Sequence, residues 1–212
     1  MLNVLCLSLK TVFYMWALLI KDLKVELRRR FEILASLSFV LVSSLLIAQA
    51  SFLTTRDLLI PAFFVVVVFI AVFTSTTSFV REMDAKTIYG LKLLPIPPYA
   101  VFLAKSAFAF ILIVFQGFLE LVFLAVFSND FGLFALTPVF ILFSFYIAVI
   151  SAFASALVMY SEGRSFLIPM IVFVFTVPII TTLLRLDVVV LFLETLAITL
   201  AITTLSPYVL EE

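Results

Sequence analysis

The stretches ILASLSFVLVSSLLIAQASFL (residues 33–53) and LLIPAFFVVVVFIAVFTSTTSFV (residues 58–80) decide the fold. Neither contains a charged side chain, and each is about as long as the roughly 20 residues that a helix needs to cross the hydrocarbon core of a membrane. A transmembrane β-barrel would instead show alternating segments of about 10 residues. Because a helix satisfies its own backbone hydrogen bonds in lipid, the two stretches predict a helical hairpin within a membrane, joined by the turn TTRD at 54–57.

Four more apolar stretches extend this pattern along the chain. They cover residues 99–127, 133–159, 166–184, which include Pro169 and Pro178, and 188–205. With 66% hydrophobic and 12% charged residues, the chain of 212 residues is far more apolar than a soluble domain, which is roughly half apolar and a quarter charged. We therefore predict an all-α polytopic membrane protein, a single transmembrane domain over residues 1–212 with six spans within residues 31–205.

Residues 1–30 precede the first span and predict an amphipathic helix that lies in the membrane interface. Its apolar side chains recur at steps of three and four, and polar or basic side chains fall on the opposite face. A coiled-coil arm is the alternative, because the spacing also fits heptads. The apolar stripe comprises Leu2, Leu5, Leu9, Val12, Trp16, Leu19 and Leu23, and the opposite face comprises Asn3, Lys10, Tyr14, Ala17, Lys21, Lys24 and Arg28.

The lysines and arginines predict the orientation, because cytoplasmic segments of membrane proteins carry an excess of them. If the N-terminus is inside, only Arg56 and Arg185 of the 13 basic residues lie outside, and eleven lie inside. This distribution predicts an inner-membrane protein with both termini in the cytoplasm. The eleven are Lys10, Lys21, Lys24, Arg28, Arg29, Arg30, Arg81, Lys86, Lys92, Lys105 and Arg164.

Composition also argues against several functional classes. The formal net charge is 0, which disfavours a nucleic-acid-binding protein. The chain has no histidine and one cysteine, Cys6, so imidazole-dependent catalysis and a cysteine metal cluster are excluded. Its four glycines are too scattered to form a phosphate-binding loop. We therefore expect no enzymatic activity, no cofactor or metal held by this chain, and ATP hydrolysis only in a partner chain.

The segment REMDAKTIYGLKLLPIPP (residues 81–98) is the longest non-spanning stretch after the N-terminal helix. Acidic residues open it, leucines occupy its middle and prolines close it, an order that predicts a short amphipathic helix stopped by proline. Such a helix would present an apolar knob to a cytoplasmic partner. The alternative is a polar loop that Lys86 and Lys92 hold at the lipid headgroups.

The pieces KDLKVELRRR (residues 21–30) and SFVREMDAKTIYGLKLLPIPP (residues 78–98), followed by Lys105, resemble the heme exporter B (CcmB) family. That family supplies the membrane subunit of the cytochrome c maturation system and belongs to the type-2 ABC exporter permeases. The positions that match are Glu82, Thr87, Leu91, Leu94, Pro95 and Lys105. The family usually has a small pair before the threonine, where this chain has Ala85 and Lys86, and we expect a helical rather than a tight turn there.

The resemblance implies a homodimer that binds two copies of a CcmA-like ATP-binding subunit and associates with CcmC-like and CcmD-like membrane proteins. Heme would then be a substrate of the complex rather than a cofactor of this chain, which lacks histidine. The resemblance also implies which residues couple the chain to the ATPase. These are Glu82, Asp84, Thr87, Leu91, Leu94 and Pro95 in the loop, braced by Glu26, Arg28, Arg29 and Arg30.

Two carboxylates lie inside predicted spans, where an ionised group costs several kcal/mol. Glu120 and Glu194 both fall roughly 10 Å below the outer surface at 1.5 Å per residue, and Gln116 shares a face with Glu120. With Lys105, they are candidate translocation or gating residues. The alternative is that the last two spans are broken near the outside, as Pro178 suggests, so that Glu194 lies in wetted headgroups beside Arg185.

Three other classes of protein share parts of this pattern. A type-2 permease for a lipid, drug or polysaccharide would have the same fold and a different substrate. A secondary carrier without an ATPase would show repeat-related broken helices. A membrane scaffold for cytochrome assembly would transport nothing.

Overall fold

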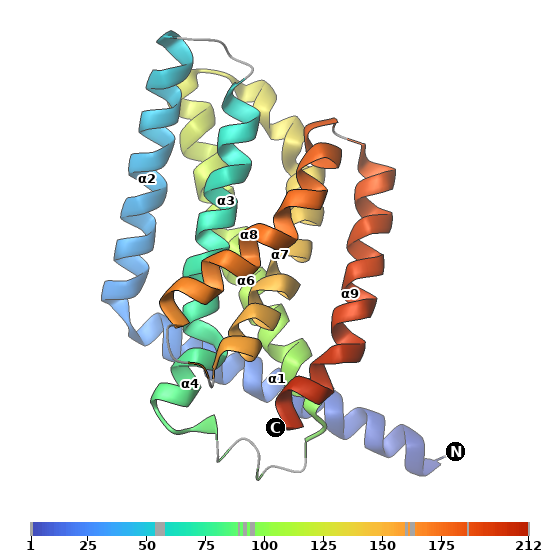
Figure 1. The fold of residues 1–212 in the computed structure, drawn as a ribbon. Coiled ribbons are helices and arrows are strands. Elements are labelled where there is room, and N and C mark those ends of the chain that lie inside the picture. The colour runs from blue at the N-terminus through green and yellow to red at the C-terminus, as the bar shows by residue number, and fades with distance from the viewer. Residues whose placement is uncertain are drawn as a thin grey trace.

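The computed structural model describes residues 2–53, 58–88, 90, 93, 96–159, 161, 164–185 and 187–211, and the elements it defines there are all helices. Figure 1 shows a bundle of long helices with one helix across its base. The prediction of an all-α fold is confirmed for this part of the chain. In order, the helices are α1 (Leu2–Arg28), α2 (Arg30–Leu53), α3 (Leu59–Ser75), the π-helix η2 (Thr76–Val80), α4 (Arg81–Asp84), α6 (Pro98–Ser128), the 3-10 helix η3 (Phe131–Leu136), α7 (Thr137–Val158), α8 (Arg164–Arg185) and α9 (Val188–Glu211).

Five helical stretches in the described residues are long and apolar enough to cross a membrane. They are Ile33–Phe52, Leu59–Asp84, Pro98–Ser128, Phe131–Val158 and Val188–Ser206, so each corresponds to a predicted span. The remaining predicted span is α8, whose qualifying apolar part is the shorter stretch Phe166–Ile180. The chain is therefore compatible with a polytopic membrane protein, and six spans remain a prediction.

The helix that begins at Leu59 changes its pitch before it ends. Residues Thr76–Val80 form a π-helical turn, in which Ser78 has non-helical backbone angles (φ −87°, ψ −115°). Such a turn leaves backbone N–H groups without their usual partners. Ser155 of α7 provides the acceptor, because its Oγ lies 3.0 Å from the N of Phe79 and 3.3 Å from the N of Val80. The wide turn is thus supported by a neighbouring helix.

Helix α7 forms the core of the bundle, since residues on nearly all its sides are buried. Edge-to-face contacts connect it to α3, with ring centroids 5.6 Å apart for Phe63 and Phe140 and 5.4 Å apart for Phe64 and Phe143. Gly117 of α6 lies directly against Phe140, where an added Cβ would come within 2.6 Å of the ring. A small residue is what allows α6 to approach α7 this closely.

Helix α1 runs across the base of the bundle, and both ends of the chain lie at that end (Figure 1). Leu18, Asp22 and Glu26 are buried, whereas Val12 and Trp16 of the predicted apolar stripe are 60% and 63% exposed. The face that contacts the bundle is therefore partly acidic, and of the predicted apolar stripe Val12 and Trp16 are turned outward while Leu19 and Leu23 are half-buried. The predicted helix is confirmed, and its position in the membrane interface remains a prediction.

The turn at Ala85 and Lys86 is tight, so the expectation of a helical turn there is wrong. Lys86 has a left-handed backbone (φ 56°), and its N–H donates to the Met83 carbonyl while that of Thr87 donates to the Glu82 carbonyl. This pair of bonds is the Schellman motif that ends many helices, usually with glycine at the left-handed position. Helix α4 therefore ends at Asp84. Leu91, Lys92, Leu94 and Pro95 lie outside the described residues, so the amphipathic helix expected there stays a prediction.

Candidate functional site: a charged junction at the base of the bundle

Six charged side chains from three helices meet where α1 crosses the base of the bundle. Helix α1 contributes three of them, α4 contributes two and α6 contributes one. The described contacts form two groups, one of four side chains around Lys105 and one pair, Glu26 with Arg81. The set contains three cations and three anions, so its formal charges cancel. We call it the charged junction, and its members are Lys21, Asp22, Glu26, Arg81, Glu82 and Lys105.

Lys105 is the centre of the junction and is only 2% exposed. Its Nζ lies 2.8 Å from Glu82 Oε1 and 2.8 Å from Asp22 Oδ2, and 5.8 Å from the centroid of the Phe79 ring. A buried ammonium is tolerated when it has partners of opposite charge. Here it has two, one from α1 and one from α4. Lys105 therefore fixes three helices relative to one another.

The outer part of the junction connects α1 directly to α4. Lys21 Nζ lies 2.7 Å from Glu82 Oε1 and 3.4 Å from Asp22 Oδ1, and Arg81 Nη1 lies 2.6 Å from Glu26 Oε2. Burial alone would lower the pKa of Lys21, but its hydrogen bond to Glu82 and the charges of Glu82 and Asp22 outweigh burial and raise that pKa above 10.5. Lys21 therefore stays charged at neutral pH.

A cavity of about 280 Å³ adjoins these groups. It is lined by charged members of the junction together with Thr87 and Phe108. Glu82 Oε2 is buried and has no protein hydrogen-bond partner among the described residues. The other oxygen of the same carboxylate, Oε1, is paired with both Lys21 and Lys105. The cavity therefore borders the buried ion pairs that Glu82 makes.

The structure brings together only some of the residues proposed to couple the chain to an ATPase. Glu26 and Glu82 belong to the junction, and Thr87 Oγ1 donates to the Glu82 carbonyl at 3.2 Å. Asp84, Arg28 and Arg29 have exposed side chains beside it. The side chain of Arg30 and residues Leu91, Leu94 and Pro95 lie outside what is described.

Sequence reasoning missed the roles of Lys21, Asp22 and Arg81. One signal was available: Asp22 and Glu26 are four residues apart and therefore share one face of a helix. Two acids on one face of an otherwise basic helix indicate a cationic partner elsewhere in the chain. Lys105, which was grouped with the gating candidates, is that partner for Asp22.

The intramembrane carboxylates lie in two different helix contacts. Glu120 of α6 is fully buried and accepts from Ser43 of α2 at 3.0 Å, and Gln116 donates to Ser36 of α2 at 3.2 Å. Glu194 of α9 accepts from Thr182 of α8 at 3.1 Å. Both α8 and α9 are continuous helices, with Pro169 and Pro178 inside α8, so the alternative of broken outer ends is wrong.

Comparison with known proteins found no relative of this chain. No protein family matched the chain, and neither the curated proteins nor the solved structures gave a match. In the described residues, no group of three or more Cys, Asp or Glu side chains is placed to hold a metal ion.

Proposed function

We propose that the chain is the membrane permease subunit of an ABC-type exporter that handles or exports heme for the biogenesis of c-type cytochromes, driven by a separate ATP-binding subunit. The resemblance of residues 21–30 and 78–98 to the CcmB family supports this proposal. The observation that carries it is the charged junction, in which Lys105 pairs with both Asp22 and Glu82. Through these contacts, the two segments expected to meet the ATPase are joined to a membrane-spanning helix.

The junction suggests how a cytoplasmic partner moves the bundle. A push on α4 or on α1 reaches α6 through ion pairs that are buried and therefore expensive to break. Helix α6 then moves with them, because separating Lys105 from its two carboxylates would leave charges unpaired in a largely apolar setting. In this proposal, the chain works as a homodimer in the inner membrane with both termini in the cytoplasm. CcmC-like and CcmD-like proteins complete the complex.

A type-2 permease for a lipid, drug or polysaccharide is the second candidate. It shares the junction and the mechanism and differs in substrate. A scaffold that transports nothing would need no mechanical link between α1, α4 and α6, so the junction favours a driven permease.

Purification of the chain from membranes that contain its natural partners tests the proposal. We expect an ATP-hydrolysing subunit and a heme absorption band to co-purify with it. An ATPase without heme supports the permease for another substrate. If neither an ATP-hydrolysing subunit nor heme co-purifies with the chain, the proposal is contradicted.

A matched pair of variants then tests the junction itself. Glu82→Gln should keep the ATPase bound but reduce the formation of c-type cytochromes, because Lys105 and Lys21 lose a shared charged partner. Lys24→Gln changes an exposed charge on the same helix as Lys21 and should leave cytochrome formation unchanged. If the two variants reduce cytochrome formation equally, the charged junction has no role in the proposed mechanism.

A further inference from the structure

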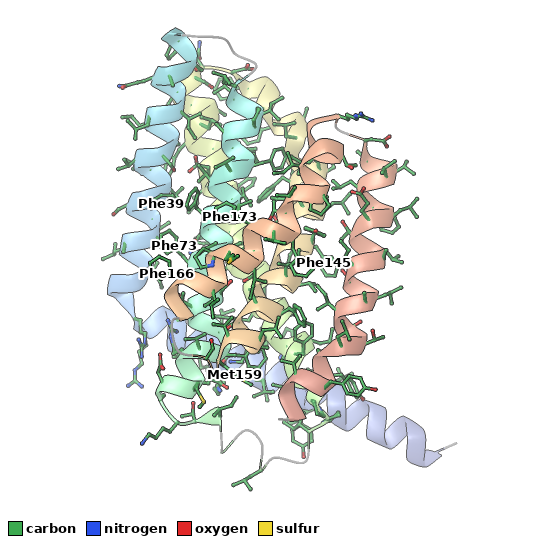
Figure 2. The ribbon with its side chains drawn as sticks, viewed as in Figure 1. Phe39, Phe73, Phe145, Met159, Phe166 and Phe173 are labelled. Atoms are coloured by element: carbon green, nitrogen blue, oxygen red, sulfur yellow. The ribbon has the colours of Figure 1, made fainter. Side chains whose placement is uncertain are left out.

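A second and larger cavity, of about 640 Å³, lies between α1, α2, α3, α4 and α6. Its volume is within the range of about 300–1,000 Å³ that is usual for small-molecule sites. We call it the α2–α3 cavity. Phe39 of α2 and Phe73 of α3 line it and face each other with ring centroids 5.5 Å apart, and both are labelled in Figure 2.

The two ends of the α2–α3 cavity differ in polarity. One end has the side chains of Glu26, Arg29, Arg81 and Asp84, and the other has Phe39, Phe73 and Leu112. Phe39 follows Arg29 by ten residues, nearly all of them within α2, which places the aromatic part about 14 Å from the charged part at 1.5 Å per residue. The cavity is therefore long, apolar at one end and charged at the other.

The polar groups inside the apolar part largely satisfy each other. Gln116 Nε2 donates to Ser36 Oγ at 3.2 Å, and Ser36 Oγ donates to the Ile33 carbonyl. The aromatic wall continues outward from Phe39 to Phe69 (6.3 Å) and from Phe69 to Phe173 of α8 (5.7 Å). Phe73 is 50% exposed, so the cavity opens sideways onto the face of the bundle that lipid would cover. An acyl chain can enter along this route.

The charges at the polar end select the headgroup. Two cations and two anions line it; Arg81 lies 2.6 Å from Glu26, and Arg29 and Asp84 also have partners within the protein. A purely anionic headgroup would meet the carboxylates of Glu26 and Asp84, and a purely cationic one would meet the two guanidinium groups. A headgroup that carries both signs places its phosphate near the arginines and its ammonium near the carboxylates.

From this match of charge, length and polarity we infer that the α2–α3 cavity is a binding site for one zwitterionic phospholipid, with an acyl chain against Phe39 and Phe73 and the headgroup at Arg29 and Asp84. The inference goes beyond the proposed function and does not depend on the identity of the exported substrate. A lipid seated here contacts α1 and α4, which also form the charged junction. Lipid binding and the junction therefore share Glu26 and Arg81.

Tryptophan fluorescence can test this site, because the chain has a single tryptophan, Trp16. In a Trp16→Phe background, Phe73→Trp places a reporter in the cavity. Phe145→Trp on α7 is the matched control, since Phe145 is 43% exposed, lies outside the cavity and is labelled on another part of the bundle in Figure 2. The full chain in detergent is titrated with phosphatidylethanolamine or phosphatidylglycerol that carries bromine on its acyl chains, which quenches nearby tryptophan.

We expect quenching at position 73 to saturate at about one lipid per chain and to need several-fold less phosphatidylethanolamine than phosphatidylglycerol. Quenching at position 145 should depend on the total lipid concentration and be the same for the two headgroups. Equal behaviour of the two reporters would show only a surrounding layer of lipid and overturn the inference. A preference for phosphatidylglycerol at position 73 would overturn it as well.

A second pair of measurements tests the headgroup contacts. The Arg29→Gln, Asp84→Asn double variant removes one charge of each sign and keeps the net charge at zero, and it should abolish the preference for phosphatidylethanolamine. Both side chains are exposed, so the fold should tolerate the change. If glycerophosphoethanolamine, which has no acyl chains, competes as well as the intact lipid, the site binds a free headgroup and the inference is wrong.

Discussion

Lys105 and Glu82 form an ion pair of 2.8 Å between the first turns of α6 and the segment that follows α3. The two side chains are 2% and 9% exposed, so water screens the pair only weakly. Asp22 of α1 completes the arrangement at 2.8 Å from the same ammonium. Removing this cation would leave the two carboxylates with the more exposed Lys21 as their common partner, and they would lose their buried one.

We expect Lys105→Met to lower the free energy of unfolding by about 3 kcal/mol. That value is at the low end of the range for breaking a buried ion pair, because Lys21 still contacts Glu82. Thermal unfolding in detergent measures the effect. Lys24→Met is the control, because Lys24 is exposed on α1, and it should change the unfolding temperature little. Similar shifts for the two variants would contradict the role given to Lys105.

The hydrogen bonds from the π-helical turn to Ser155 predict a difference between two serines of α7. Ser155→Ala removes the acceptor for the N–H groups of Phe79 and Val80, and we expect it to destabilise the chain by about 1–3 kcal/mol. Ser144 is equally buried, but its Oγ has no partner in the described residues. Ser144→Ala should therefore be neutral or stabilising. The reverse order of unfolding temperatures would argue against this account of the turn.

The close approach of α6 to α7 at Gly117 predicts that alanine is not tolerated there. The added Cβ would come within 2.6 Å of the Phe140 ring, which is buried and already packs against Phe63, so we expect a loss of about 1–3 kcal/mol. Phe140→Leu in the same chain should recover part of it. Gly90→Ala, where the new Cβ meets no described atom within 4 Å, is the control for replacing a glycine. Unfolding in detergent compares the three variants, and equal losses for Gly117→Ala and Gly90→Ala would rule out the clash.

The buried carboxylate of Glu120 predicts different effects for two adjacent serines of α2. Ser43 donates to Glu120, whereas Ser44 donates, among the described residues, to the Leu41 carbonyl of its own helix. Because Glu120 is fully buried and its other oxygen has no partner in the part of the chain that the structure describes, we expect Ser43→Ala to destabilise by about 1–3 kcal/mol and Ser44→Ala by much less. Unfolding temperatures measure both.

A functional test accompanies this prediction. If Glu120 and Glu194 form a gate, the double variant Glu120→Gln, Glu194→Gln should impair formation of c-type cytochromes. Normal activity of the double variant would refute a gate. It would leave the bond between Ser43 and Glu120 as a structural contact.

The helices were largely predictable, because uncharged runs of about 20 residues have few other stable forms in a membrane. The stretch predicted at 99–127 is α6 (Pro98–Ser128), which ends where Asn129 takes a left-handed backbone (φ 53°). The stretch predicted at 133–159 is covered by η3 and α7. In both cases a polar break in the sequence marks the boundary within a few residues.

The charged junction was predictable only in part. Periodicity shows that Asp22 and Glu26 share a face, but it does not show which helix meets that face, and only tertiary packing brings Lys105 there. The tight turn at Lys86 was missed because its left-handed position is usually glycine, and lysine gives no local signal for it. The π-helical turn was missed because it depends on Ser155, a residue about 75 positions away.

The number of residues in the wide turn at Thr76–Val80 determines where the side chains that follow it point. Each residue of a regular helix advances about 100° around the axis, so one extra residue in a single turn changes the direction in which every later side chain of that helix points. Arg81 and Glu82 follow the turn directly, and their aim toward α1 and α6 includes this offset. Deleting one residue between Thr76 and Val80 would rotate both charges away from their partners, whereas the same deletion in a loop would be absorbed locally.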